Sequence, residues 1–232
     1  DRGAECVAAS RALTLLPKVL AEGSSSRAPF GAATLAHLGA AAPLVSDAVA
    51  ALARLIRAHV AAAPADRPLR ILEIAAGSGA LTRAIADLGE DPRVTLTVSD
   101  PDATAAERLR FAFAGRPGLS VTAFDPSAED EAPGPFDLVV GALGWGHALS
   151  GPDALRRLGT TLGDGGALML AALAPQPLLD VTFGLEPGWF ERSASDEFPV
   201  GVARDASDWA HDLGDARLAD HVVAPLDGVR AP

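Results

Sequence analysis

A turn made of small residues follows the first strongly apolar, strand-like run of the sequence. The run 69–74 leads into residues 75–79, which include Gly77 and Gly79, and a helical pattern follows over 80–88. In a doubly wound sheet, ligands bind beyond the carboxyl ends of the strands, and glycine lets the backbone approach a ligand closely. We therefore interpret the turn as a candidate binding site. The alternative is a tight strand-to-helix connection that binds nothing.

The residues around this turn restrict the ligands that fit it. A dinucleotide fingerprint would need a third glycine where Thr82 stands, and a phosphate-binding P-loop would need a lysine that this segment lacks. Glu73 precedes the turn, and Asp100 ends the next strand-like run. An ionised carboxylate accepts two hydrogen bonds at once, which suits the hydroxyls of a ribose. The two acids beside the turn therefore favour a ligand that contains a ribose.

The elements that must position these residues alternate between strands and helices. Strands are predicted at 69–74, 94–100, 119–124, 136–141, 167–173 and 218–226, and helices at 80–88, 104–114, 153–162 and 207–213. An amphipathic helix is predicted to begin near Pro43 and to end before Pro64, and a glycine turn is predicted at 163–166. Residues 1–43 are poorly patterned. The alternation predicts an α/β fold with a mostly parallel, doubly wound sheet covered on both faces.

Composition excludes several classes of function. The 232 residues carry 19 Lys+Arg and 30 Asp+Glu, a net charge of −11, which disfavours nucleic acid as a partner because phosphates need a cationic surface. Cys6 is the only cysteine, so disulfides and thiolate zinc sites within the chain are excluded, and the five histidines show no metal-ligand spacing. We expect no metal, no membrane span and no signal peptide, and hence a cytoplasmic protein. The start at Asp1 indicates a piece of a longer chain.

The segment Glu73-Ile74-Ala75-Ala76-Gly77-Ser78-Gly79 resembles motif I of class I S-adenosylmethionine-dependent methyltransferases, with Ala75 where the motif often has glycine. The spacing to Asp100 and the strand at 136–140 are similar to that family as well. The resemblance implies a Rossmann-like methyltransferase fold with S-adenosylmethionine as cofactor. The cofactor-binding residues that it implies are Glu73, Ala75, Gly77, Gly79, Asp100 and Asp125.

A narrower resemblance lies further along the chain. The segment from Leu179 to Phe190 is similar to the loop after the fifth strand in C-methyltransferase domains of modular polyketide synthases. The resemblance covers most of 35–226 and implies a helical N-terminal lid region at 1–66 and a methyltransferase-like core at 67–232. It also implies an acyl carrier protein and neighbouring synthase domains as partners. Alternatively, the aromatic residues of this segment simply pack on the core.

In that family, a histidine oriented by a glutamate removes the proton from the α-carbon of a β-ketoacyl chain, and His147 stands where this histidine belongs. A carboxylate on the other ring nitrogen sets the tautomer and stabilises the imidazolium. The glutamate is expected at Ala172, and no carboxylate occurs between Asp164 and Asp180. The alternative for His147 is a histidine that merely lies in a loop.

Two main hypotheses follow from these residues. The first is a pseudo-methyltransferase, a folded but catalytically inactive domain that is structural within a polyketide synthase module. The second is an active C-methyltransferase in which Glu186 or Asp180 orients His147. An unrelated small-molecule methyltransferase is a third possibility. Since both this chain and a carrier protein are acidic, docking would depend on local arginine patches such as Arg156-Arg157.

Overall fold

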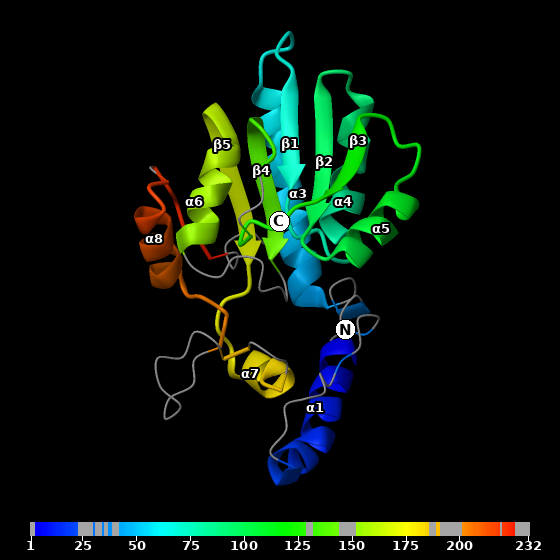
Figure 1. The fold of residues 1–232 in the computed structure, drawn as a ribbon, viewed down its shortest axis with the longest axis vertical. Coiled ribbons are helices and arrows are strands. Elements are labelled where there is room, and N and C mark those ends of the chain that lie inside the picture. The colour runs from blue at the N-terminus through cyan, green and yellow to red at the C-terminus, as the bar shows by residue number, and fades with distance from the viewer. Residues whose placement is uncertain are drawn as a thin grey trace, which may run out of the picture.

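The computed structural model describes residues 3–22, 30, 34, 37–38, 42–128, 132–143, 152–185, 189–190, 201–218 and 220–225 (Figure 1). The elements run in the order α1 (Gly3–Glu22), α3 (Pro43–Ala62), β1 (Leu69–Glu73), α4 (Ala80–Ile85), the 3-10 helix η1 (Ala86–Glu90), β2 (Val94–Asp100), α5 (Ala103–Ala112), β3 (Leu119–Ala123), β4 (Phe136–Leu143), α6 (Pro152–Thr161), β5 (Leu162–Ala172), α7 (Pro177–Phe183) and α8 (Ala206–Asp215). No described helix is both long and apolar enough to cross a bilayer.

The described strands form one five-stranded sheet in the order β3-β2-β1-β4-β5, and every pairing is parallel. Glu73, the last residue of β1, lies opposite Val98 of β2 and Val140 of β4. The carboxyl ends of the three central strands therefore meet at one edge, where a ligand site of this architecture lies. The predicted parallel α/β sheet is confirmed.

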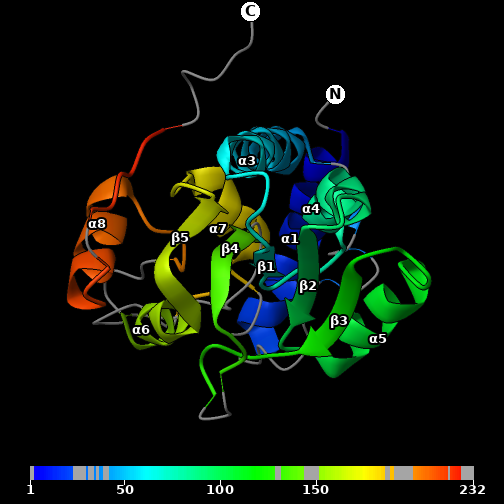
Figure 2. The same ribbon diagram turned by 90° about the horizontal axis from the view of Figure 1, so that it is seen from above.

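Helices cover both faces of the sheet (Figure 2). On one face, α3 and α4 pack with the apolar side chains of β1 and β2, and Ile56 of α3 is fully buried there. On the other face, α6 buries Leu155 and Leu158 against the sheet, and α8 packs on the same cluster. Burial on both faces is consistent with the largely buried residues of β1 and β2, in which Arg70 and Thr95 are the exposed exceptions.

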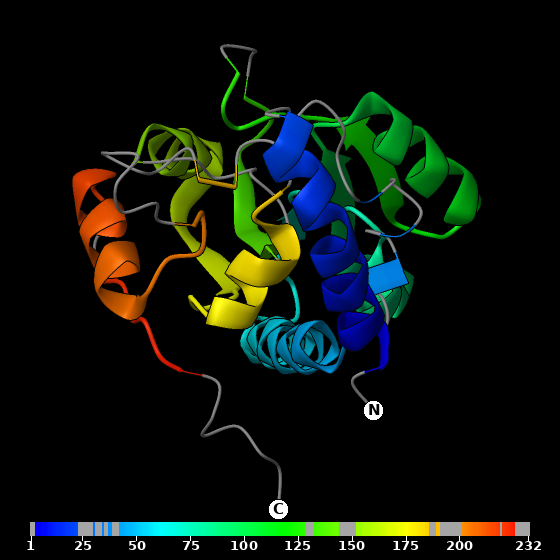
Figure 3. The same cartoon turned by 90° about the horizontal axis from the view of Figure 1, so that it is seen from below.

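Two further helices, α1 and α7, contact each other and lie across the carboxyl ends of the strands (Figures 1 and 3). They enclose a third apolar cluster, in which Ala8 and Ala12 of α1 meet Leu179 and Phe183 of α7. Trp189 is buried in the same cluster, with its ring 5.4 Å from that of Phe183. These contacts agree with the simple packing role considered for the aromatic residues of this segment.

The predicted boundary at residue 66 stays a prediction, and packing crosses it. Helix α3 precedes the boundary and packs on the sheet, whereas α7 follows it and packs on α1. The expectation of a loop after the fifth strand is wrong for residues 177–183, which form α7. Pro177 at the first turn suits a helix start, and Leu179 and Phe183, four residues apart, form its buried side.

Residues 1–43 contain a 20-residue helix, α1, whose small residues pack on α7 without an obvious apolar period. Two other expectations need correction. The glycine turn at 163–166 lies within β5: Phe136 pairs with Leu162 but Leu138 pairs with Ala167, so the extra residues form a bulge. The strand expected at 218–226 is absent from the described residues of that range, where Val222 is exposed and pairs with no strand.

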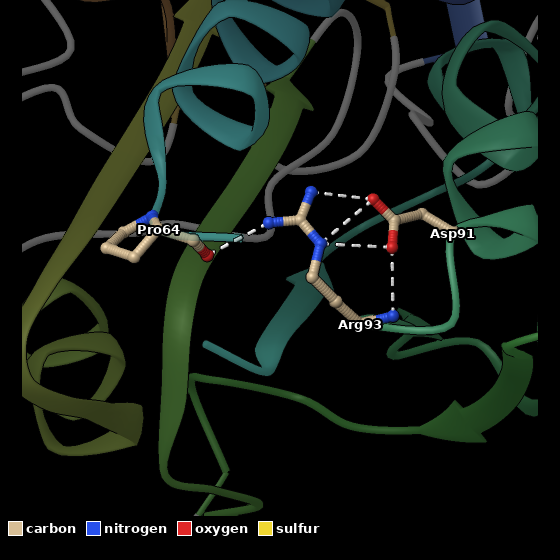
Figure 4. Close-up of polar contacts among 3 residues, drawn as sticks. All are labelled: Pro64, Asp91 and Arg93. Carbon is tan, nitrogen blue, oxygen red and sulfur yellow. Dashed lines mark hydrogen bonds and ion pairs between the residues drawn. The ribbon is translucent and has the colours of Figure 1, made fainter. Parts of the chain in front are cut away.

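At the opposite edge of the sheet, where the strands begin, ion pairs and hydrogen bonds join the strands to the segment that follows α3. Arg93 donates hydrogen bonds to both carboxylate oxygens of Asp91 and to the backbone carbonyl of Pro64 (Figure 4). At the start of β4, Asp137 accepts hydrogen bonds from the Arg67 guanidinium and from the backbone N–H of Arg70. These contacts join the segment after α3 to the sheet. They leave the carboxyl edge free for a functional site.

Candidate functional site

The turn after β1 is held by backbone contacts on both sides. The N–H of Ile74 donates to the carbonyl of Val140 in β4 at 2.9 Å, and the N–H of Ala76 donates to the carbonyl of Ser99 in β2 at 3.0 Å. The hydroxyl of Ser99 also donates to the carbonyl of Glu73 at 2.9 Å. The turn is therefore built into the centre of the sheet, and its position follows from the register of three strands.

Three residues of the turn have left-handed backbone conformations, with φ values of +49° at Ala75, +55° at Gly77 and +74° at Gly79. A Cβ atom on Gly79 would lie 2.8 Å from the side chain of Leu109 in α5, so this glycine allows α5 to pack closely on the turn. A Cβ atom on Gly77 would have a single neighbour, at 3.8 Å. Gly77 therefore offers open backbone that a ligand can approach.

Asp100, at the end of β2, connects this strand to the turn. Its Oδ2 accepts a hydrogen bond of 2.7 Å from the N–H of Gly77, and its Oδ1 accepts one of 2.9 Å from the N–H of Asp102. The residue is only 6% exposed. Because a carboxylate has about four acceptor positions, each oxygen keeps capacity for one further hydrogen bond, such as one from a ribose hydroxyl.

Asp125 lies beyond the end of the neighbouring strand. The pairing of Asp100 with Ala123 brings the end of β3 to the same edge, and Asp125 follows two residues later. Its Oδ1 accepts hydrogen bonds from the backbone N–H and the hydroxyl of Ser127. The structure thus places Asp100 and Asp125 at neighbouring strand ends on the edge that holds the glycine turn.

Glu73 is the most buried acid of the described site, with 1% of its surface exposed. Burial raises its pKa to about 8; Thr82 and the Arg83 guanidinium lower the pKa in part, and the charge of Asp100 raises it further. Glu73 Oε2 and the hydroxyl oxygen of Thr82 are both buried without a hydrogen-bond partner. The turn thus has one carboxyl that is protonated at neutral pH, which the pattern of two acids did not predict.

Two residues of α4 contribute to the turn: Thr82, which stands where a dinucleotide fingerprint has glycine, and Arg83, which belongs to no recognised motif. Helix α4 places Thr82 against Glu73, and Nη2 of Arg83 donates a hydrogen bond of 2.9 Å to the carbonyl of Ser78 in the turn. A signal for Arg83 was present, because a residue one helical turn after a glycine loop can reach back to the loop carbonyls. The described residues contain no cluster of three metal-ligating side chains.

Of the residues expected to take part in catalysis, the structure describes only Ala172 and Asp180. His147 and Glu186 lie outside the described residues. Ala172 ends β5 and pairs with Leu143, the last residue of β4, so a methyl group stands where the resemblance places a carboxylate. Asp180 belongs to α7, where its Oδ1 accepts a hydrogen bond of 2.9 Å from the Trp189 indole.

Residues 47–222 match the model of a protein family described as a methyltransferase domain. The chain belongs to this methyltransferase family. Over 184 residues the domain is 35% identical to the polyketide synthase ThaG of Burkholderia thailandensis, a match that covers 73% of this chain and 3% of ThaG.

Solved structures of carbon methyltransferases share the fold of the methyltransferase domain. CurJ carbon methyltransferase matches with a TM-score of 0.74 at 20% identity, over 93% of this chain and 60% of that chain. The CMeT domain of the citrinin polyketide synthase matches with a TM-score of 0.76 at 21% identity, over 93% and 59%. The trans-methyltransferase CalH, in complex with SAH (S-adenosylhomocysteine), matches with a TM-score of 0.56 at 21% identity, over 79% and 51%. The Rossmann-like methyltransferase fold is confirmed.

The buried carboxyl of Glu73 makes stability depend on pH. Since its pKa is higher in the folded chain than in the unfolded one, its contribution to stability is lost as pH rises from about 4.5 to about 8. Glu73→Gln removes this ionisation, so the variant should match the parent near pH 5 and exceed it near pH 8 by up to about 5 kcal/mol. Urea unfolding at both pH values measures this. The exposed Glu107→Gln is the control, and an equal difference at both pH values would contradict the assignment.

The left-handed conformation of Ala75 predicts an unusual effect of glycine. An alanine with φ +49° is strained by roughly 1–2 kcal/mol, while glycine adds about 0.5–1 kcal/mol of chain entropy to the unfolded state. Ala75→Gly should therefore raise the free energy of unfolding by about 0.5–1 kcal/mol. Ala76→Gly, at the neighbouring residue with negative φ, should lower it by a similar amount. Urea unfolding compares the two, and a loss of stability in Ala75→Gly would show that Ala75 is unstrained.

Proposed function

We propose that this methyltransferase domain is the C-methyltransferase-like part of a polyketide synthase module and that it is catalytically inactive, a pseudo-methyltransferase with a structural role in the module. The identity with ThaG and the shared fold with CurJ and the citrinin synthase domain support the module context. The absence of an orienting acid at the end of β5 supports inactivity.

The proposal depends above all on Ala172. Its pairing with Leu143, the last residue of β4, puts it at the carboxyl edge of the sheet. A methyl group can neither accept a hydrogen bond from an imidazole nor stabilise an imidazolium. Asp164, the only carboxylate of β5, lies near the amino-terminal start of the strand, eight residues before Ala172.

The residues of the turn fit S-adenosylmethionine, which supplies an electrophilic methyl group when bound. Asp100 keeps free acceptor positions for the ribose hydroxyls, and the backbone at Gly77 is open. Asp125 adds an acceptor from the neighbouring strand end. Ala75 and Gly79 give the turn its shape, and Glu73 remains a neutral, buried group beneath it at neutral pH. Cofactor binding is thus compatible with a domain that does not methylate.

The missing acid affects proton removal, which is a separate requirement from cofactor binding. The proton on the α-carbon of a β-ketoacyl chain must pass to a base, and His147 is the candidate base. General-base catalysis contributes about 10²–10⁴-fold, and part of this depends on an imidazole held in the correct tautomer. Without an acid at position 172, the domain lacks the group that would hold it.

The alternative is an active S-adenosylmethionine-dependent C-methyltransferase acting on a β-ketoacyl chain bound to a carrier protein. The intact turn with Asp100 favours this candidate. It requires Glu186 or Asp180 to orient His147. One oxygen of Asp180 already accepts the Trp189 indole N–H, so this side chain is anchored within the cluster between α1 and α7.

The decisive test combines cofactor binding with methylation. The parent domain is titrated calorimetrically with S-adenosylmethionine and then assayed for α-methylation of a β-ketoacyl group on an acyl carrier protein. We expect no methylation above background in the parent. We expect Ala172→Glu to raise the rate by at least about 10²-fold, because it restores the acid beside the candidate base. Mass spectrometry of the carrier-bound product measures the gain.

Two matched variants make this test specific. Ala172→Gln has nearly the same size but no charge and should give little gain, and His147→Ala in the Ala172→Glu background should abolish the gain while leaving cofactor affinity intact. Robust methylation by the parent would refute inactivity. If Asp180→Asn or Glu186→Gln then removed that activity, the alternative would be correct.

A further inference from the structure

The outward face of α5 exposes a large aromatic side chain. Phe111 is 88% exposed, although the fold buries most side chains of its kind. Arg108, one helical turn earlier, lies on the same face, because residues three positions apart are neighbours on a helix. Arg116 follows shortly after the helix ends. We call Arg108, Phe111 and Arg116 together the α5 surface.

The fold does not need Phe111. Helix α5 packs through its opposite side, where Ala105, Ala106 and Leu109 are buried, and Phe113 is buried just after the helix. An exposed phenyl ring contributes no hydrophobic stabilisation to the folded state, because its apolar area stays in water. Aromatic and arginine side chains are enriched at the centres of protein interfaces. The composition of the α5 surface therefore matches a docking site.

The segment that carries the α5 surface has a net charge opposite to that of the rest of the chain. Residues 103–118 contain three arginines and one glutamate, a net charge of +2, whereas the remaining residues contain 16 basic and 29 acidic side chains, a net charge of −13. An acidic partner is repelled by most of the molecule and attracted here. Such a contrast directs an encounter to one face.

The arginine pair considered from the sequence is engaged within the fold. Arg156 binds the carboxylate of Asp153 and the carbonyl of Asp215, and Arg157 also has a contact, so the patch considered from the sequence is partly used internally. By contrast, the side chains of Arg108 and Arg116 make no hydrogen bond or ion pair with any residue that the structure describes. Both guanidinium groups are available to an acidic partner.

The α5 surface also lies close to the candidate cofactor turn. Asp102, two residues after Asp100, caps the start of α5. The inner side of α5 presses on the turn, since Leu109 and Phe113 are the nearest neighbours of a Cβ atom built on Gly79. A partner on the outer side is separated from the turn by about one helix diameter, roughly 10 Å. Figure 2 shows α5 beside β3, away from α6 and α8.

We infer that the α5 surface docks an acidic carrier protein, with Phe111 in an apolar recess of the partner and with Arg108 and Arg116 paired with its carboxylates. The inference rests on the proposed polyketide synthase context for the identity of the partner. It does not depend on whether the domain methylates, because a pseudo-methyltransferase kept for its contacts needs such a surface as much as an enzyme does.

The test measures the affinity of the whole domain for the holo acyl carrier protein of the same synthase module, by calorimetric titration or surface plasmon resonance. Phe111→Ala should weaken binding by about 10-fold or more, as expected for a central aromatic contact. Arg108→Glu with Arg116→Glu should weaken it further and reduce its dependence on salt. Thermal unfolding should be nearly unchanged for Phe111→Ala, because that side chain is exposed.

The chain offers a matched control on another helix. Leu55 of α3 is 58% exposed and Arg54 precedes it, so Leu55→Ala and Arg54→Glu remove an exposed apolar group and a cation elsewhere. These changes should leave carrier affinity intact. Equal affinities of the parent and Phe111→Ala, or no binding by the parent, would overturn the docking inference. Equally tight binding of duplex DNA, insensitive to Phe111→Ala, would also overturn it, since the surface would then be a general anion site.

The outcomes of this titration are separate from those of the methylation assay. Carrier binding that is lost in Phe111→Ala supports the docking surface whether or not the carrier-bound chain is methylated. If the parent domain methylates the carrier-bound chain, the proposed inactivity is refuted. If its carrier affinity is also unchanged in Phe111→Ala, the docking role of the α5 surface is refuted as well. Neither result can be mistaken for the other, because one reports affinity and the other reports product.

Discussion

The hydrogen bond from the backbone N–H of Gly77 to the Asp100 carboxylate is the constraint on which the candidate site depends. It holds Gly77 against the end of β2, while backbone hydrogen bonds fix the neighbours of Ala75 to β4 and β2. A left-handed alanine persists only where its surroundings determine its conformation more strongly than its own preference. The same carboxylate is the candidate ligand for a ribose, so the group that shapes the turn is also the group that a cofactor would contact.

The two halves of the sheet differ in what they contribute. Around β1, β2 and β3, the strand ends bring together an open backbone, two acids at neighbouring positions and a buried neutral carboxyl. At the ends of β4 and β5, the paired residues are Leu143 and Ala172. Asp180, the acid of α7, accepts a hydrogen bond from the Trp189 indole in the cluster between α1 and α7. Because the turn after β1 and the ends of β4 and β5 are separate parts of the sheet, such a domain can keep its fold and the candidate cofactor turn without an acid that orients a general base. In such a domain, the exposed residues of α5 are the candidate contact surface for a partner.

Much of the fold was predictable because strand-length runs rich in apolar residues alternate with helical patterns along the chain. The runs at 69–74, 94–100 and 136–141 were recognisable for this reason, and the glycine turn followed from the residues that interrupt the first run. The features that the sequence pattern did not show have a common cause. Helix α1 is stabilised by contact of its small residues with α7, and β5 extends back through a glycine bulge because β4 pairs with it. The strand expected at 218–226 finds no partner among the described residues of that range. In each case the deciding contact is distant in sequence.

For the site, residue types alone determined that the turn after β1 resembles a methyltransferase motif, that no dinucleotide or P-loop pattern is complete, and that position 172 lacks a carboxylate. These are properties of side-chain chemistry and local spacing. Only the tertiary structure decided that Glu73 is buried and protonated at neutral pH, that Asp100 holds Gly77, that Asp180 serves Trp189 and that Phe111 remains in water. Burial, pKa and hydrogen-bond partners depend on which segments pack together in the folded chain. The order of those segments in the sequence does not determine this packing.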